Sequence, residues 1–375
     1  MDWTAFRTRF PVTTKWAFLD HAAVAPLPRV AADAVREYVD DMALNGIVSF
    51  LRWDARLKEA RLLAGRLLNA DPLDVAFIPN TSTGISLVAE GFPWQPGDNL
   101  ITAAEEYPSN QYPWMNLRDR GVEVRAVPSR GNRIALDDLR KAIDGRTRLV
   151  SLSAVEFASG YRNHLSAIGE MCRERGIFFF VDAIQSLGVL PLDVNHLPID
   201  ALAADGHKWL LGPEGAGLFW LRRDWLDRLR VTNVGWNSVI NCHDFGTIDF
   251  RLKPHAGRFE GGTYNVGGIV GLAESIKLLL EAGIPEIAER VLALTDHACE
   301  KMTRAGWTVF SSRERGEQSG IVSLVKAGVS PIEVKKRCEE AGIIVNVRAG
   351  RLRISPHAYN TYEELDRFVA TANRD

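Results

Sequence analysis

The chain has 375 residues, of which 46% are hydrophobic and 25% are charged, as in an ordinary soluble globular protein. Its formal net charge of −2 provides no positive field that would hold nucleic acid or an anionic membrane. The four cysteines lie far apart, which argues against a disulfide framework or a metal site and fits a reducing compartment. Since no signal-peptide core or membrane-length apolar run is present, we expect a cytoplasmic protein with no membrane or nucleic-acid partner.

Helical patterns alternate with short apolar runs between about residues 55 and 230. The expected helices are 57–70, 84–92 and 165–176, and the expected strands are 74–80, 98–104, 122–128, 148–155, 177–183 and 201–205. Several of these strands are nearly continuous apolar runs, which is typical of strands buried on both faces of a parallel sheet. The pattern therefore predicts an α/β fold with a mainly parallel sheet, whose ligands bind beyond the carboxyl ends of the strands.

The pattern changes after about residue 256. A glycine-rich stretch leads into a long helical region, 265–305, and then into short strands and a final helix. We expect a large domain over residues 16–255 and a smaller α+β domain over residues 256–375. Residues 1–15 are expected to pack with the smaller domain.

Three features converge at the predicted strand ends. Asp182 closes a buried strand, where a carboxylate either caps the next turn or faces a cation or a cofactor nitrogen. Lys208 follows the next strand among apolar neighbours, where it either extends into solvent or acts as an amine of lowered pKa. Residues 81–84 open a helix with Thr, Ser, Thr and Gly, which form either a plain cap or an anion site.

An amine, a buried carboxylate and a phosphate cradle together describe a pocket for pyridoxal 5'-phosphate. The segments "VDAIQSLG", "DGHKWLLGP" and "RFEGGT" resemble those of fold-type I enzymes that use this cofactor, in the class V aminotransferase superfamily. The superfamily includes cysteine desulfurases, kynureninases and isopenicillin N epimerases. The resemblance implies a seven-stranded, mainly parallel sheet between helices in the large domain, and an enzyme acting at the Cα of an amino-acid substrate.

The resemblance also implies roles for individual side chains around the cofactor. Lys208 resembles the catalytic lysine that forms the internal aldimine and shuttles the proton, and Asp182 resembles the partner of the pyridine nitrogen. The other implied cofactor contacts are Gln185 at the phenolic oxygen, Ser82, Thr83 and His207 at the phosphate, Tyr107 stacked on the ring, and Asn110 nearby. Tyr112 and Trp114 are alternatives to Tyr107 for the stacking position.

Further residues resemble those that complete such a site. Arg353 resembles the arginine that binds the substrate α-carboxylate, with its neighbours Arg348 and Arg351 as alternatives. His21 lies in a segment that lines the substrate mouth. Thr263 resembles the threonine that reaches the phosphate of a partner subunit, which implies a homodimer with a shared active site.

The chain departs from the desulfurase pattern at residues 347–355, "VRAGRLRIS", which contain no cysteine. We therefore disfavour a desulfurase that forms a persulfide on its own cysteine. Phe157 also stands where many relatives place an asparagine. Transamination and lyase chemistry stay open, with kynureninase-like or epimerase-like activity as alternatives.

Two rival classes of function are weighed against the enzyme. A non-catalytic module that keeps only the fold is disfavoured because Lys208, Asp182, Gln185 and Arg353 are all intact. A nucleotide-binding Rossmann enzyme is disfavoured because the glycine-rich stretch at 212–217 comes after the lysine instead of after an early strand.

Overall fold

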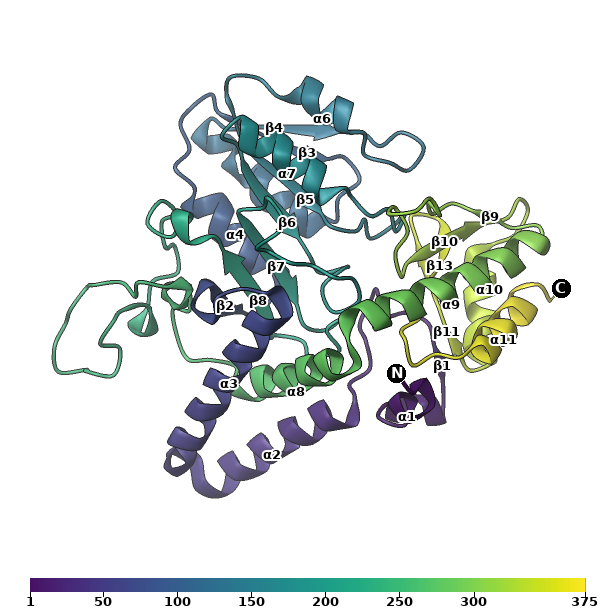
Figure 1. Ribbon diagram of the computed structural model, residues 1–375, viewed down its shortest axis with the longest axis horizontal. Coiled ribbons are helices and arrows are strands. Elements are labelled where there is room, and N and C mark those ends of the chain that lie inside the picture. Colours follow the sequence, from purple (N-terminus) through teal and green to yellow (C-terminus); the bar gives the residue numbers. More distant parts are fainter. Residues whose placement is uncertain (375) are drawn as a thin grey trace.

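A seven-stranded sheet lies at the centre of the larger part of the computed structural model, which describes residues 1–374 (Figure 1). The strand order is β2-β8-β7-β6-β5-β3-β4, in which β8 alone runs antiparallel to its neighbours. The strands are β2 (Val75–Ile78), β3 (Asn99–Ala103), β4 (Glu123–Val127), β5 (Thr147–Ser153), β6 (Phe178–Asp182), β7 (Ala201–Asp205) and β8 (Gly217–Leu221). The predicted mainly parallel sheet is thus confirmed.

Both faces of this sheet are covered, as the apolar strands require. In β6, Phe179 and Val181 join the apolar core on one face, while Phe178 and Phe180 join the core on the other. The first face is covered by α3 (Phe50–Leu68), α6 (Leu136–Ala142), α7 (Leu165–Glu174) and α8 (Val266–Ala282). The second face is covered by α4 (Thr81–Gly91) and α5 (Tyr112–Met115).

A helical hairpin extends below the sheet in Figure 1 and is formed by α2 (Arg29–Asn45) and α3. Helix α8 packs along both of its helices. The expected long helix of 265–305 is divided at Gly283, whose φ of +84° ends α8 before α9 (Ile284–Arg304) begins. Because α8 belongs to the core of the large domain, we propose that the domain division lies at Gly283 instead of near residue 255.

The smaller part contains an antiparallel sheet with the order β12-β13-β10-β9. Its elements are β9 (Thr308–Val309), β10 (Val322–Val325), β12 (Asn346–Arg348), β13 (Arg351–Ile354), α9, α10 (Pro331–Glu340) and α11 (Tyr362–Ala372). The N-terminal segment lies against this part, because β1 (Ala17–Phe18) pairs with β11 (Ile343–Ile344). Arg7, in α1 (Trp3–Arg7), also forms an ion pair with Glu364 at 2.7 Å.

In the part of the chain that the structure describes, no helix is both long and apolar enough to cross a membrane.

Candidate active site

A cavity of about 320 Å³ lies at the carboxyl ends of β6 and β7, where side chains of the smaller part approach the large sheet. This is the place where a parallel α/β sheet is expected to bind its ligand. The cavity is lined by residues 22–24 and 80–82, and by Tyr107, Ser109, Phe157, Asp182, Ile184, Gln185, Asp205, His207, Lys208, Arg348 and Arg353. We refer to it below as the Lys208 cavity.

The amine of Lys208 enters this cavity just after the end of β7. Burial is the main cause that lowers its pKa to about 8; the charge of Arg353 lowers the pKa as well, and that of Asp182 opposes the shift. The ammonium nitrogen lies 5.6 Å from the centre of the Tyr107 ring. The result is an amine that is partly neutral near neutral pH, which is what a nucleophile requires.

The carboxyl group of Asp182 lies at the end of β6, on the strand next to β7. Its Oδ1 accepts a hydrogen bond of 3.0 Å from the backbone N–H of Ile184. Burial raises the pKa of Asp182 to about 6, and the Ile184 hydrogen bond and the charge of Lys208 act in the opposite direction. Asp182 is thus a carboxyl group that is ionised above about pH 6 and faces the same cavity as the amine.

The N-terminus of α4 supplies polar groups to the lining of the cavity. Asn80 caps the helix by accepting from the backbone N–H of Thr83 at 2.9 Å. The Ser82 hydroxyl donates to Ser109 at 2.8 Å. His207 Nδ1 lies 2.9 Å from Asp205 Oδ2. Hydroxyls, a histidine and a helix N-terminus are a suitable set of groups for a phosphate.

Two of the residues expected at the phosphate lie elsewhere. Thr83 and Thr263 do not line the Lys208 cavity; both line a neighbouring cavity of about 270 Å³. Thr83 points away because its backbone N–H and its hydroxyl both interact with the Asn80 cap. Their phosphate contacts therefore stay predictions that depend on a second subunit or on a different side-chain position.

Gln185 lines the cavity, but its amide is engaged within the protein. Its Nε2 donates to the carbonyl of Ala22 at 3.1 Å, and its Oε1 accepts from the indole N–H of Trp209 at 2.9 Å. These bonds fix the amide against the segment that precedes α2. A contact with the phenolic oxygen of a cofactor stays a prediction.

Asn110 and His21 are fully buried and do not line the Lys208 cavity. Asn110 accepts from Trp114 Nε1 at 2.9 Å and from the Ser151 hydroxyl at 2.6 Å. His21 contacts the Tyr359 hydroxyl at 2.8 Å and the carbonyl of Ser355 at 2.9 Å, and burial lowers its pKa to about 4. In this conformation the side chains of both residues are engaged within the protein, and their cofactor and substrate contacts stay predictions.

Arg353 extends from β13 into the cavity and is 1% exposed. Its Nη1 donates to the carbonyl of Phe157 at 2.9 Å, and its Nη2 pairs with Asp20 at 3.1 Å. The guanidinium group is thus held in a fixed position before any substrate binds. A fixed planar cation of this kind suits bidentate binding of a carboxylate.

Sequence reasoning missed several residues of this site. Asp20 holds Arg353, and Asp205 lies beside His207. Of the two arginines weighed beside Arg353, Arg348 also lines the cavity and Arg351 does not. The position of Asp205 at the end of a predicted strand could have indicated it. Asp20 becomes recognisable only when the N-terminal segment is placed against the smaller sheet, where it pairs with Arg353.

Comparison with known proteins identifies the family. The sequence model described as "Aminotransferase class-V" matches residues 17–368. The chain belongs to the class-V aminotransferase family. Its members use pyridoxal 5'-phosphate, and the chain is accordingly a pyridoxal-phosphate-dependent enzyme.

Curated relatives of this class-V chain include two probable cysteine desulfurases. The one from Methanothermobacter thermautotrophicus is 32% identical over 295 residues, covering 77% of this chain and 73% of the relative. The one from Pyrococcus abyssi is 29% identical and covers 97% of this chain and 95% of the relative. The missing cysteine at residues 347–355 led us to disfavour a desulfurase, and the names of these relatives do not support that part of the expectation.

Solved structures agree with the class-V fold. The cysteine desulfurase CsdA from Escherichia coli matches with a TM-score of 0.90 at 25% identity, covering 100% of this chain and 98% of the other. A cystine C-S lyase called C-DES, in complex with cysteine persulfide, matches with a TM-score of 0.91 at 24% identity, covering 97% and 99%. At 24% identity, the similarity to C-DES is evidence for the fold alone.

The Lys208 cavity fits the cofactor of the family. A lysine of lowered pKa lies on one side, a buried carboxyl group lies at a neighbouring strand end, and hydroxyls at a helix N-terminus form another wall. These groups match the aldehyde, the ring nitrogen and the phosphate of pyridoxal 5'-phosphate in chemical character.

Proposed function

We propose that this enzyme is a lyase that removes a β-substituent, such as a sulfur group, from an amino acid of the cysteine type. The names of the relatives support a substrate of this type. The observation that carries the proposal is the placement of Lys208, Asp182 and Arg353 around one cavity. When bound, pyridoxal phosphate supplies an aldehyde for the substrate amine and a ring that accepts the electrons released at Cα.

Lys208 is the proposed catalytic base. With a pKa of about 8, roughly a tenth of its amine is neutral at pH 7, so it is able both to take up the cofactor and to remove a proton from Cα. Arg353 is proposed to bind the substrate carboxylate, which fixes Cα relative to the amine of Lys208. The bonds of Arg353 to Phe157 and Asp20 keep its guanidinium group from moving as the carboxylate arrives.

Asp182 is proposed to hold the proton of the cofactor ring nitrogen. Its low exposure of 3% keeps water away from that contact and strengthens it. Ser82 and His207 are the proposed phosphate contacts, and Tyr107 is the proposed stacking ring. Tyr107 already packs edge-on against Phe157, with ring centres 5.2 Å apart.

The proposed lyase differs from a desulfurase that stores sulfur on its own cysteine. The β12–β13 hairpin turns through Ala349 and Gly350, so no cysteine-bearing loop lies between Arg348 and Arg353. All four cysteines are among the described residues, and none lines the Lys208 cavity. Three of the cysteines are buried. Burial raises the thiol pKa of Cys172 to about 12 and those of Cys299 and Cys338 to about 11. The sulfur product is therefore expected to leave into solution.

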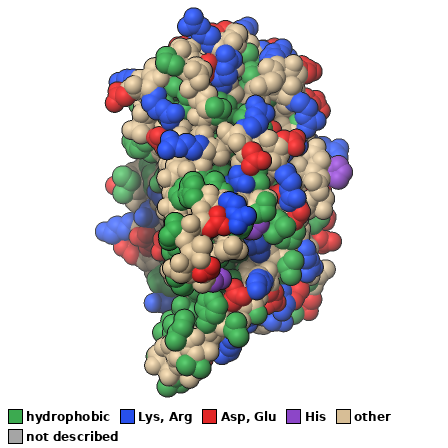
Figure 2. Space-filling model, turned by 90° about the vertical axis from the view of Figure 1, so that its left-hand side faces the viewer, with side chains coloured by type: hydrophobic (Ala, Val, Ile, Leu, Met, Phe, Trp, Pro, Cys, Tyr) green, Lys and Arg blue, Asp and Glu red, His purple; other side chains and the backbone are tan. Residues whose placement is uncertain are grey.

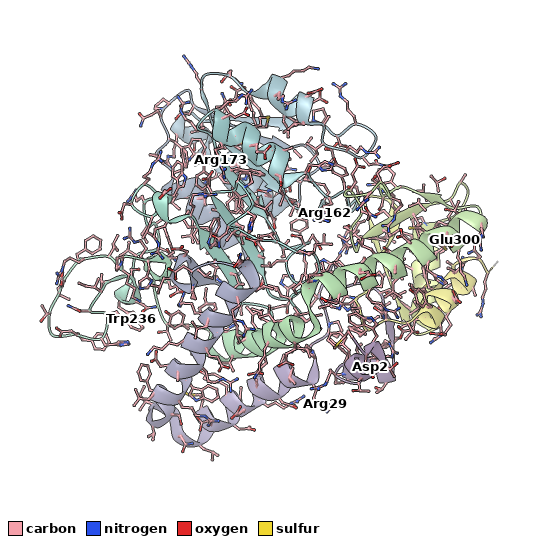
Figure 3. All side chains as sticks on the ribbon, viewed as in Figure 1. Asp2, Arg29, Arg162, Arg173, Trp236 and Glu300 are labelled. Carbon is pink, nitrogen blue, oxygen red and sulfur yellow. The ribbon has the colours of Figure 1, made fainter. Side chains whose placement is uncertain are left out.

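We also propose that the enzyme acts as a homodimer. Leu44, Ile47, Val48 and Leu51 at the tip of the α2–α3 hairpin are 79–84% exposed, which is unusual for large apolar side chains. We call these four residues the hairpin tip. Figure 2, in which the left-hand side of Figure 1 faces the viewer, shows hydrophobic side chains gathered at the lower end of the molecule. Ile47 also lines a cavity with Thr263 and Trp236, the latter labelled in Figure 3, so the apolar surface continues toward Thr263. This continuity supports a subunit contact that brings Thr263 to the partner's site.

The test is a product screen on the purified enzyme loaded with cofactor. L-cysteine, L-cystine and L-alanine are supplied separately, and pyruvate, ammonia, sulfide or persulfide, and L-alanine are measured. Pyruvate with released sulfur, lost in Lys208→Ala, is the expected result. Formation of L-alanine from cysteine, with sulfur bound to the protein, would instead establish a desulfurase. Conversion of the cofactor to its amine form by L-alanine would establish an aminotransferase and overturn the proposal.

A further inference from the structure

Two other carboxyl groups, those of Glu106 and Glu156, are buried close to Asp182. Glu106 is 3% exposed and Glu156 is 5% exposed, and neither lines the Lys208 cavity. They have no place in the mechanism proposed above. A buried carboxyl group is costly when it is ionised, so each needs a physical explanation.

Ser153 connects the first of these groups to Asp182. It is the last residue of β5 and is directly paired with Asp182 on β6. The backbone N–H of Ser153 donates to Glu106 Oε1 at 2.6 Å, and the Ser153 hydroxyl donates to Glu106 Oε2 at 2.5 Å. The Glu106 carboxyl group is therefore fixed at the strand end beside Asp182.

Asn163 connects the second group to the same serine. Its Nδ2 donates to the carbonyl of Ser153 at 2.8 Å and to Glu156 Oε1 at 2.9 Å. The three carboxyl groups thus belong to one network that extends from the Lys208 cavity into the protein.

The second oxygen of Glu156 has no donor in this network. Among the described residues, Glu156 Oε2 is buried and makes no hydrogen bond. The charges that act most strongly on Glu156 are the carboxylates of Glu106, Asp182 and Glu105. The charge that acts most strongly on Glu106 is the carboxylate of Asp182. A buried anion with an unpartnered oxygen and only negative neighbours of this strength is unfavourable.

A proton on Glu156 removes this cost, because it turns the unpartnered acceptor into a donor. A small cavity of about 60 Å³ borders Glu156 and is also lined by Glu105, Ser129 and Arg351. It has room for a water molecule that accepts the new hydrogen bond.

We propose that Glu156 is a positioning residue that remains protonated while Asp182 ionises, so that it adds no negative charge to the network that holds Asp182. The functional meaning of this inference rests on the proposed role of Asp182 at the ring nitrogen. If all three groups were ionised, their repulsion would return a proton to Asp182 and remove its charge from the cofactor.

The order of proton release agrees with this reading. Burial raises the pKa of Asp182 to about 6, that of Glu106 to about 7, and that of Glu156 well above its ordinary value. As pH rises, Asp182 ionises before Glu106, and Glu156 keeps its proton well above the ordinary range of a glutamate.

Infrared difference spectroscopy of the cofactor-free protein tests the inference directly. Protonated carboxyl groups have a carbonyl band that ionised groups lack, and aspartate labelled with ¹³C in its side-chain carboxyl group separates the Asp bands from the Glu bands. We expect a Glu band that persists at neutral pH and is lost in Glu156→Gln. We expect a second Glu band that disappears at about pH 7 and is lost in Glu106→Gln.

Coupling to Asp182 distinguishes a positioning role from a merely structural one. Asp182→Asn removes a neighbouring negative charge and should lower the pH midpoint of the Glu106 band, by roughly one unit. Glu105→Gln is the matched control, since Glu105 is the exposed neighbour of Glu106 and bonds to Ser129. It should leave the midpoint of the Glu106 band unchanged, because the charge of Glu105 acts on Glu156 and not on Glu106.

The absence of a protonated Glu band at neutral pH, or an unchanged Glu106 midpoint in Asp182→Asn, would overturn the inference. Wild type, Asp182→Asn and Glu105→Gln suffice for these readings if the other variants fail to fold. Because no cofactor or substrate is present, failure of the proposed lyase activity would leave the bands unaffected, so the two failures are distinguishable.

Discussion

The pKa of the Lys208 amine is lowered mainly by burial and not by any single charged partner. Among residues 1–374, no hydrogen bond holds its nitrogen, and Tyr107 is the nearby aromatic group. Burial and the charge of Arg353 favour the neutral amine, while Asp182 favours the ammonium ion. The balance places the proton equilibrium about 2.5 pH units below the ordinary lysine value of 10.5, at about 8.

This balance predicts how cofactor uptake depends on pH. Only the neutral amine attacks the cofactor aldehyde, so the rate of uptake by cofactor-free protein should rise about tenfold per pH unit and level off above about pH 8. Stopped-flow absorbance of the bound cofactor measures this rate. Arg353→Met removes a charge that lowers the pKa of Lys208, so its midpoint should lie at higher pH. A wild-type rate that continued to rise to pH 10 would contradict the assignment.

The sequence correctly predicted which residues line the cavity where a residue lies at or just after the end of a strand. Asp182, His207 and Lys208 come at the ends of apolar runs, and all three line the cavity. Thr83 and Asn110 were expected there from their positions in motifs, but local hydrogen bonds direct them elsewhere. Such competition between a local cap and a ligand contact is not visible in the sequence.

At the scale of elements, the N-terminus of α4 serves two purposes. The Asn80 side chain accepts from the backbone N–H of Thr83 and also lines the Lys208 cavity. The same residue therefore stabilises the helix and shapes the place proposed for the phosphate.

Asn80→Ala should separate these two purposes. Loss of the cap should lower the free energy of unfolding by about 1 kcal/mol in urea denaturation of the cofactor-free protein. Cofactor affinity should also fall, by up to about tenfold, because the helix end is less well ordered. Ser330→Ala is the matched control, since Ser330 caps α10 in the smaller part of the molecule and lies outside the Lys208 cavity. It should cost similar stability, and a similar loss of affinity there would argue against a specific role for Asn80.

The strands of the large sheet were predictable because burial on both faces leaves a simple sequence pattern. β6 is the clearest case, with apolar side chains at every position before Asp182. The division between α8 and α9 was missed because a single glycine, Gly283, ends one helix where the apolar pattern continues. The pairing of β1 with β11 joins segments more than 300 residues apart, as the partners Ala17 and Ile343 show, and no local pattern indicates it.

At the scale of the whole molecule, the exposed apolar side chains are unevenly distributed. The hairpin tip and Phe245, Ile248 and Phe250 of the long loop after β8 are exposed by 70–95% and include most of the large apolar side chains that are at least 70% exposed. Charge does not explain this distribution, because the net charge is only −2. A contact with a second copy would bury these side chains and gain roughly 25 cal/mol for each Å² of apolar surface removed from water.

Replacement of the apolar side chains should therefore break the proposed dimer and its activity together. Wild type is expected to have the mass of a dimer in light scattering, and the double variant Val48→Glu with Leu51→Glu should shift toward the monomer. Activity should fall with the dimer fraction, because Thr263 of each chain is proposed to complete the site of the other. Ile332→Glu is the matched control: Ile332 is 70% exposed on α10, away from the hairpin tip, and its charge should change neither mass nor activity. A fully active monomer would contradict the shared site while leaving the Lys208 cavity as the place of reaction.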